Sequence, residues 1–198
     1  IAVHGPNART LLANIVDGDI SNEAAPWLTC RTHEIALVPD VRMLRVNFIG
    51  ELGWELHHQI EYQRQLLCAL MEAGEDLGVL FMGSRVIDGL RLEKSYRVIG
   101  RDLDIEHSAL EAGLNRFVDF DKVAFIGRGA LAREREAEST KRLVTFRAEA
   151  ARKILSGNEG LFASGRQIGR VTSANFSFAE NCVLGLAYIG AEFAVSGT

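Results

Sequence analysis

Alternating apolar residues in the first half of the chain predict a β-hairpin. The two alternating runs are Val41 to Phe48 and Trp54 to Gln59, and the segment between them contains Gly50 and Gly53, which suits a tight connection. With this pairing, the apolar residues that share a face are Leu44, Val46 and Phe48 in the first run and Trp54, Leu56 and Ile60 in the second. Glu55 then lies on the polar side of its strand, where its carboxylate is well presented.

Apolar residues at helical spacing predict three helices in the same half of the chain. The apolar faces of the first two consist of Ala8, Leu11, Leu12 and Ile15, and of Tyr62, Leu66, Leu70 and Ala73. The second of these helices spans Glu61 to Gly74. A third starts near Ser84, carries Arg85 in its first turn and continues to about Lys94 past Gly89. A glycine inside a helix costs about 1 kcal/mol relative to alanine, so its presence suggests close packing.

The pattern changes near Ser139, where the chain becomes alternating and rich in glycine. The other expected elements are short strands at Glu34 to Val38 and Arg116 to Asp119, a helical turn at Leu110 to Asn115, a solvated helix at Gly127 to Glu138, and late strands at Arg142 to Phe146, Gln167 to Ser173 and Cys182 to Ile189. We therefore expect two domains, residues 1–138 with mixed helix and sheet and residues 139–198 with strands.

Composition excludes several classes of partner and site. The net charge of −4 comes from 26 acidic and 22 basic residues without a basic tract, so the electrostatic footprint for nucleic acid is missing. Three widely spaced cysteines without a Cys-x-x-Cys pair favour a reducing compartment, the cytoplasm or the mitochondrial matrix of a eukaryote. No apolar stretch is long enough for a transmembrane helix, so no membrane partner is expected. Because the chain begins with Ile1, we expect it to be a piece of a longer protein.

Six short segments occur in the order found in one known family. They are Gly50 to Leu56, Gly83 to Arg85, Leu90 to Lys94, Gly100 to Leu103, Leu110 to Leu114 and Phe125 to Arg128. Together they resemble the tetrahydrofolate-binding aminomethyltransferase family, which includes the T-protein of the glycine cleavage system and the folate-binding C-terminal regions of dimethylglycine and sarcosine dehydrogenases. The Gly-Trp-Glu-Leu and Arg-Leu-Glu-Lys segments are more similar to the dehydrogenase-linked branch.

The resemblance implies an α+β fold and a role in one-carbon transfer. The fold would be the central folate-binding domain of the family, lacking its N-terminal part, followed by a small β-barrel that ends early at Thr198. The full protein would pass a one-carbon unit from an N-methyl or aminomethyl donor to tetrahydrofolate. In the dehydrogenase-linked branch, a fused flavin oxidoreductase domain makes an iminium whose carbon becomes methylenetetrahydrofolate; a lipoyl carrier protein is the partner in the T-protein branch.

Glu55 and Arg85 are the first two candidate folate-binding residues. Pterin presents two parallel N–H donors that one carboxylate can accept, and Glu55 occupies the family's Gly-x-Glu position for this contact. Arg85 matches the arginine of a Gly-Ala-Arg-Asp segment at a helix N-terminus, where it would pair with folate carboxylates or brace the site. Val86 stands where an aspartate is common, so an orienting ion pair is missing. Without the motif, each residue would be read as an ordinary solvated side chain.

Three aromatic residues, Phe48, Trp54 and Tyr96, are candidate stacking surfaces for the rings of folate. Aromatic residues in strands are more often core, which is the competing interpretation for each. Phe48 stands where the dehydrogenase-linked relatives often carry tyrosine. Pairing Phe48 against Trp54 also turns Phe48 away from the face of Glu55, and a bulge or register change would resolve this conflict.

Other charged residues are given structural roles. Arg91, Glu93, Arg101 and Asp102 suit an ion-pair network that holds the fold together. His57 and His58 are adjacent in a strand and point to opposite faces, so no metal site is expected. No catalytic residue is assigned, because the resemblance places the family's essential aspartate before Ile1. The chain has neither a Gly-x-Gly-x-x-Gly fingerprint nor a phosphate loop, so FAD is expected only in a separate upstream domain.

Two other functions remain open from the sequence. One is a stand-alone folate-dependent methyltransferase, demethylase or T-protein, which would share the folate site and differ in its donor pocket. The other is a folate-binding or structural module without catalysis. The sequence that precedes Ile1 in the parent protein would separate these possibilities from the dehydrogenase-linked transferase, because only that transferase requires an FAD fingerprint there.

Overall fold

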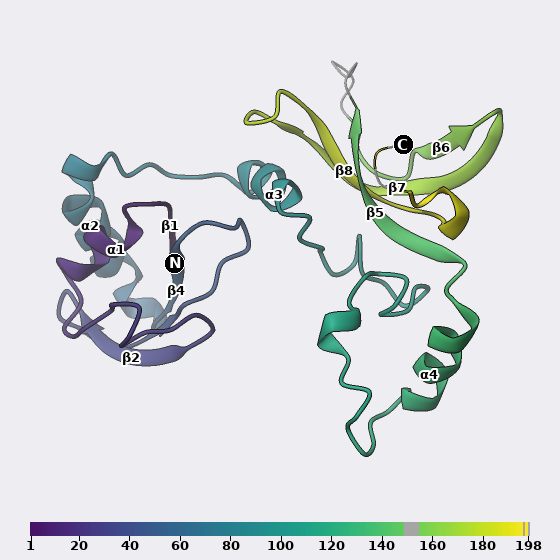
Figure 1. The fold of residues 1–198 in the computed structure, drawn as a ribbon. Coiled ribbons are helices and arrows are strands. Elements are labelled where there is room, and N and C mark those ends of the chain that lie inside the picture. The colour runs from purple at the N-terminus through teal and green to yellow at the C-terminus, as the bar shows by residue number, and fades with distance from the viewer. Residues whose placement is uncertain (149–154, 196, 198) are drawn as a thin grey trace. The chain divides into compact units, whose positions relative to one another are not determined.

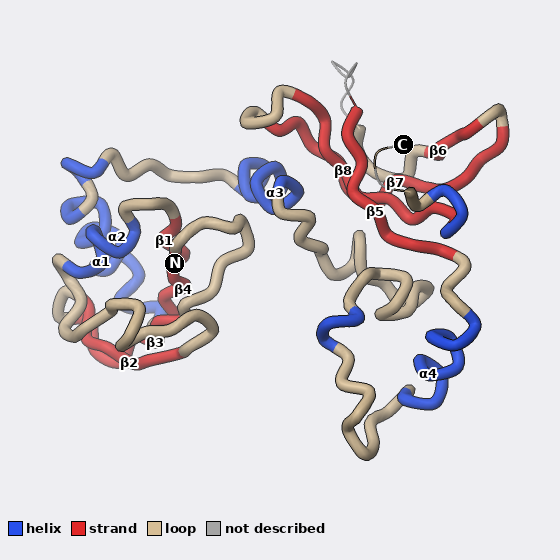
Figure 2. The backbone as a smooth tube through the Cα atoms, viewed as in Figure 1, coloured by secondary structure: helices blue, strands red, loops and turns tan. Residues whose placement is uncertain are grey.

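The computed structural model describes residues 1–148, 155–195 and 197. The chain divides into two compact units, Ile1–Ser84 and Arg85–Thr198, and each is described by itself. Figure 1 traces their elements along the chain, and Figure 2 separates helices, strands and connecting loops. Each unit contains one four-stranded sheet, so the strands that the sequence predicts early and late in the chain belong to different sheets.

The first unit is an antiparallel sheet covered on one face by helices. Its strands follow the order β1-β4-β3-β2 and span Ala2–His4, Gly53–His57, Val38–Leu44 and Cys30–Ile35. The helices are α1 (Ala8–Ala13), α2 (Gln63–Ala73) and the 3-10 turns η1 (Ile60–Tyr62) and η2 (Glu75–Leu77). Apolar side chains from both layers form one core, which includes Leu11, Leu12, Val41, Met43, Trp54, Leu56, Leu66 and Leu70. The helix spacing read from the sequence is confirmed at α1 and α2.

The predicted hairpin exists, but its connection is longer than the sequence suggested. Strand β3 ends at Leu44 and β4 begins at Gly53, so Phe48 lies in the intervening loop instead of opposite Trp54. The observed pairs are Arg42↔His57, Met43↔Leu56 and Leu44↔Glu55. The expected face of Leu44, Val46 and Phe48 is therefore wrong, because the buried residues of β3 are Val38, Val41 and Met43. Ile60 also leaves the expected face, since it begins a 3-10 turn and is largely exposed.

Positive backbone φ angles explain the misplaced strand at Glu34 to Val38. Ala36 and Leu37 have φ angles of 49° and 64°, a left-handed conformation that ends β2 at Ile35 and turns the chain into β3. An expected strand therefore spans a turn. The short strand β1 shows no alternation of apolar and polar residues that would have predicted it.

The second unit has an antiparallel sheet in the order β5-β8-β7-β6. These strands span Lys141–Ala148, Cys182–Gly190, Arg166–Ser177 and Gly160–Ala163. The helical elements are α3 (Ser84–Glu93), whose first residue closes the first unit, α4 (Arg128–Ala137), η3 (Asn115–Phe117) and η4 (Ala191–Phe193). A buried cluster of Leu92, Ala112, Leu143, Leu186 and Tyr188 joins the end of α3 to β5 and β8.

The sequence predicts most of these elements. The helices near Ser84 and Gly127 and the three late strands are confirmed, and α4 has no buried residue, as expected for a solvated helix. The strand expected at Arg116 to Asp119 is wrong, because this segment begins within the 3-10 turn η3. Strand β6 was missed. The predicted domain boundary near Ser139 stays a prediction.

None of the helices in the described residues is both long enough and apolar enough to cross a membrane.

Candidate functional site

Glu55 projects from the centre of the first sheet, on the face opposite the core. Its neighbours in sequence, Trp54 and Leu56, are each 1% exposed, and alternation turns the Glu55 side chain the other way. That side chain is 42% exposed, and His57 Nε2 donates to its Oε2 atom at 3.1 Å. Among the described residues no other group hydrogen-bonds the carboxylate. One carboxylate oxygen is therefore open to a ligand, and the other is engaged by an exposed histidine.

Gly53 allows the strand that carries Glu55 to lie close to β1. A Cβ atom at this position would meet His4 Nδ1 at 2.1 Å and the Val3 carbonyl oxygen at 2.6 Å, distances that no side chain can occupy. His4 Nδ1 is enclosed and has no hydrogen-bond partner among the described residues. Burial lowers the pKa of His4, and the nearby Glu55 carboxylate offsets this only in part. His4 is therefore held as a neutral neighbour of Glu55.

A cavity of about 610 Å³ lies beside Glu55 on the outward face of the same sheet. Leu44, which pairs with Glu55 across the strands, and His57, which contacts its carboxylate, both line this cavity. Arg42 and Asp40 supply charges of opposite sign to its wall. Glu55 is not itself a lining residue, so its carboxylate lies next to a hollow large enough for an organic ligand and not within it. Within the described residues no group of His, Cys, Asp or Glu could hold a metal ion.

Trp54 is a core residue, and its expected role as a stacking surface is wrong. The guanidinium carbons of Arg9 and Arg45 lie 5.2 and 5.7 Å from the ring centroid, within cation–π range. Asn22 Oδ1 accepts a hydrogen bond of 2.8 Å from each of these arginines and fixes them together. With 1% of its surface exposed, Trp54 offers no face to a ligand; it anchors the strand that carries Glu55.

Phe48 lies in the loop that leads into β4. Its side chain is 38% exposed, so part of the ring is accessible. The loop is shaped at Asn47, whose Oδ1 accepts a hydrogen bond from the backbone N–H of Gly50 at 2.6 Å, and Gly50 adopts a φ of 77°. This loop resolves the conflict over the register of Phe48 and Glu55, since Phe48 lies outside the paired strands of the hairpin.

Arg85 and Tyr96 belong to the second unit, at the two ends of the α3 region. The Arg85 side chain is exposed in the first turn of α3, and its guanidinium has no hydrogen bond or ion pair within the described residues. Its carbonyl oxygen accepts a hydrogen bond from Asn175 Nδ2 at 3.0 Å, which ties the helix start to β7. Tyr96 is partly buried after the helix, and its carbonyl oxygen accepts from Arg91 Nη1 at 2.9 Å.

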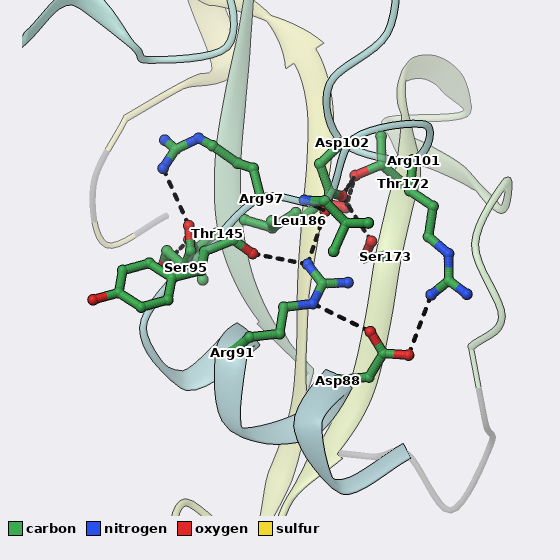
Figure 3. Close-up of polar contacts among 12 residues, drawn as sticks. Asp88, Arg91, Ser95, Arg97, Arg101, Asp102, Thr145, Thr172, Ser173 and Leu186 are labelled. Carbon is green, nitrogen blue, oxygen red and sulfur yellow. Dashed lines mark hydrogen bonds and ion pairs between the residues drawn. The ribbon is translucent and has the colours of Figure 1, made fainter. Parts of the chain in front are cut away.

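A buried ion pair between Arg91 and Asp102 organises the second unit (Figure 3). Both residues are 0% exposed, and Arg91 Nη1 lies 2.8 Å from Asp102 Oδ2. Asp88 extends the pair to the surface, because its two oxygens lie 3.4 Å from Arg91 Nε and from Arg101 Nη1. Arg91, Arg101 and Asp102 are thus confirmed as a structural network. Glu93 takes no part in it and instead accepts a hydrogen bond from Ser177 Oγ at 2.6 Å.

The sheet supplies further partners of Asp102, which the sequence pattern did not predict. Ser173 Oγ donates to Asp102 Oδ1 at 2.7 Å, and Thr172 Oγ1 donates to the same oxygen. The Tyr188 hydroxyl donates to the Asp102 carbonyl oxygen at 2.9 Å. These partners follow Asp102 by 70 to 86 positions in the sequence, so no local sequence pattern predicts these contacts. Together they satisfy a buried carboxylate that would otherwise be costly to desolvate.

The architecture and both halves of the chain match one family. The chain belongs to the glycine cleavage T-protein family: residues 1–122 match the GCVT N-terminal domain, and residues 141–198 match the glycine cleavage T-protein C-terminal barrel domain. The resemblance read from the short motifs is confirmed. The structure also resembles aminomethyltransferase T of the glycine cleavage system from Bartonella henselae, with a TM-score of 0.84 and 25% identity over 98% of this chain and 52% of that chain.

Relatives of two kinds align with all or nearly all of the chain. It is 33% identical over 198 residues to mitochondrial dimethylglycine dehydrogenase of Mus musculus, and 38% identical over 192 residues to mitochondrial sarcosine dehydrogenase of Homo sapiens. The alignments cover 100% and 96% of this chain but 23% and 20% of those proteins. It is also 34% identical over 197 residues to an aminomethyltransferase of Halothermothrix orenii, 100% of this chain and 54% of that protein. The chain therefore spans only part of each relative.

Proposed function

We propose that the chain binds tetrahydrofolate and serves as the folate-binding region of a one-carbon transferase. The carrying observation is Glu55, an exposed carboxylate fixed on a central strand beside a cavity of about 610 Å³. Membership of the glycine cleavage T-protein family supports the same conclusion.

The Glu55 carboxylate fits the pterin of a reduced folate. Pterin offers a ring N–H beside an exocyclic amino group, and a carboxylate can accept both hydrogen bonds at once. Its Oε1 atom has no hydrogen bond within the described residues, whereas Oε2 accepts from His57. Because the His57 side chain is 55% exposed, it can turn into solvent and release that oxygen. Two acceptor atoms are then available in the arrangement that pterin requires.

The other candidate residues are proposed in separate roles. Arg85, an exposed guanidinium in the first turn of α3, would bind a carboxylate of the glutamyl tail. Phe48, with 38% of its surface exposed, and Tyr96 remain candidates for contact with the rings of folate. Trp54 is not proposed as a ligand contact. Each of these roles is testable by its own variant in the whole chain.

We further propose that the complete protein forms methylenetetrahydrofolate from an iminium made by an attached flavin domain. The dimethylglycine and sarcosine dehydrogenases that align with 100% and 96% of this chain support this branch, and they are named as mitochondrial proteins. The mitochondrial matrix of a eukaryote, or the cytoplasm, would suit such a protein. In either setting the site must hold donor and folate together and protect the iminium from water.

The aminomethyltransferase that aligns at 34% identity favours a second candidate, a stand-alone T-protein that takes an aminomethyl group from a lipoyl carrier. Sequencing the gene upstream of Ile1 separates the two. A Gly-x-Gly-x-x-Gly fingerprint after a strand would support the flavin-linked protein, and a short upstream segment without it would support the T-protein.

Isothermal titration of the 198-residue chain with tetrahydrofolate tests the binding proposal. We expect saturable binding that is weakened by Arg85→Gln and unaffected by Arg64→Gln, which removes an exposed arginine of α2. An absence of saturable heat with tetrahydrofolate in the folded chain would contradict the proposed function.

A further inference from the structure

A second cavity, of about 500 Å³, lies in the second unit and involves none of the residues proposed for folate. Three cationic residues, two carboxylates and a stacked pair of rings form its wall. These lining residues are Lys141, Arg166 and Arg170, Glu106 and Glu192, and His107 and Tyr188. The cations outnumber the carboxylates.

His107 is held rigidly at the wall of this cavity. Its side chain is 6% exposed, and its ring stacks on Tyr188 with a centroid separation of 3.5 Å and an interplanar angle of 7°. Its Nδ1 atom lies 2.8 Å from Asp104 Oδ1. The Asp104 oxygen also accepts from the backbone N–H groups of Glu106 and His107, at 2.9 and 3.0 Å. A buried imidazole with this many contacts has a single orientation.

The contact with Asp104 also fixes the tautomer of His107. Partial burial raises the pKa of Asp104, but the hydrogen bonds from His107 and from the backbone outweigh it and bring the pKa below its ordinary value. The ionised carboxylate accepts hydrogen bonds only, so in the neutral imidazole Nδ1 carries the hydrogen and Nε2 has a lone pair. Nε2 has no partner within the described residues and is not among their enclosed, unpartnered atoms. His107 is a lining residue of the cavity, so Nε2 is the ring nitrogen that is open to a ligand there.

The three cationic side chains of the cavity wall come from two strands. Arg166 and Arg170 both lie on β7 and line the cavity, and Arg170 pairs with Tyr188 in the sheet. Lys141, at the start of β5, pairs with Gly190 on the neighbouring strand. None of the three has a carboxylate partner within 4.0 Å in the part of the chain that the structure describes. Their charge is available to a ligand.

We propose that this cavity binds a small ligand that carries an oxyanion group, carboxylate or phosphate, next to a hydrogen-bond donor. Arg166, Arg170 and Lys141 hold the oxyanion, because guanidinium groups bind carboxylate and phosphate through paired N–H donors. His107 Nε2 accepts the hydrogen bond of the neighbouring O–H. Glu106 and Glu192 repel the second oxyanion of a larger polyanion, which favours compact ligands.

Carbon–proton NMR of the His107 ring in the 198-residue chain tests this site. Inorganic phosphate and malate serve as the two probes, and sodium chloride at matched ionic strength is the control. We expect the His107 ring signals to shift saturably with at least one probe and to stay in place with chloride. Saturation by phosphate alone or by malate alone assigns the oxyanion source. An absence of saturable shift with both probes would overturn the proposal.

Two variants separate a built site from general charge. Arg170→Gln should weaken the binding by about tenfold, as expected for loss of a charged donor to an oxyanion. Arg133→Gln, which removes an exposed arginine of α4, should leave it unchanged. Equal weakening by both variants would contradict the site. Nitrogen-15 shifts of the wild-type ring give an independent check, because protonation at Nε2 in place of Nδ1 would remove the acceptor that the proposal requires.

Discussion

Arg91 Nη1 and Asp102 Oδ2 lie 2.8 Å apart in the second unit, and both side chains are closed off from solvent. Asp102 also binds the β7 hydroxyls of Thr172 and Ser173, so this pair joins α3 and the loop after it to the sheet (Figure 3). Desolvating two charges is costly, and the many hydrogen bonds to Asp102 offset that cost. The pair therefore has a structural role: it connects the helix region to the sheet.

Removing Asp102 should destabilise the second unit strongly. Asp102→Ala leaves the buried Arg91 charge with only its 3.4 Å ion pair to Asp88 among the described residues, and we expect the free energy of unfolding to fall by about 3–5 kcal/mol. Arg101→Ala is the matched control, because its pair with Asp88 is 3.4 Å long and its side chain is 58% exposed, so the loss should be below about 1 kcal/mol. Urea unfolding measures both. Similar losses in the two variants would argue against the structural role of the buried pair.

Stability should decline in alkaline solution because of Tyr188. Burial, reinforced by the charges of Asp104, Glu111 and Asp102, raises the pKa of Tyr188 from 10.0 to about 12. The folded chain thus holds this proton more tightly than the unfolded chain does, and the contribution is complete below pH 10 and is lost as pH rises toward 12. Unfolding of wild type and Tyr188→Phe between pH 9 and about 12 checks this. The variant should lose part of the pH dependence, and identical slopes would contradict the assignment.

Gly169 should not tolerate a side chain. A Cβ atom there would meet the Tyr188 carbonyl oxygen at 2.2 Å and the Ile189 Cα at 2.9 Å, so the β7–β8 pairing would have to open. We expect Gly169→Ala to cost at least about 1–3 kcal/mol through overpacking. Gly83→Ala is the control, because nothing lies within 4 Å of its Cβ position. Thermal unfolding followed by circular dichroism compares them, and an unchanged midpoint for Gly169→Ala would refute the close approach of the strands.

Trp54 should matter for stability far more than the other tryptophan, Trp27. Truncating a buried aromatic residue to alanine costs about 3–5 kcal/mol, and Trp54 is 1% exposed, with two arginines against its ring. Trp27 is 48% exposed, so Trp27→Ala should cost much less. Urea unfolding by circular dichroism provides the comparison. A larger loss for Trp27→Ala would show that the core of the first unit is assigned wrongly.

Local sequence patterns predicted elements well where one face is buried over several turns or pairs. Helix α2 places Leu66 and Leu70 in the core, as their apolar spacing indicated. Strand β8 lies where the sequence predicted a strand, but it is almost continuously buried and not alternately buried. The failures have local causes. The strand expected at Glu34 to Val38 crosses a left-handed turn at Ala36, and the hairpin register depended on a loop that residue types did not fix.

The site was predictable only in part. Alternation along β4 correctly predicted an accessible Glu55, but the same alternation buried Trp54, which had been considered as a ligand contact. The sequence did not predict the contacts that Asp102 and His107 make with residues of distant strands. Ser173 reaches Asp102 across 71 positions, and His107 lies on Tyr188 of another element. Such contacts follow from tertiary pairing, which no short motif encodes.

Calorimetric titration of Glu55→Gln with tetrahydrofolate tests the central claim most directly. The glutamine keeps the shape of the side chain but replaces one acceptor oxygen with an amide and removes the charge. Glu51→Gln, at an exposed position in the preceding loop, is the matched control. We predict that Glu55→Gln weakens binding by about 1.5–3 kcal/mol, as for a hydrogen bond to a charged group, while Glu51→Gln binds as wild type does. Unchanged affinity in a folded Glu55→Gln chain would contradict the assignment of Glu55 to the pterin.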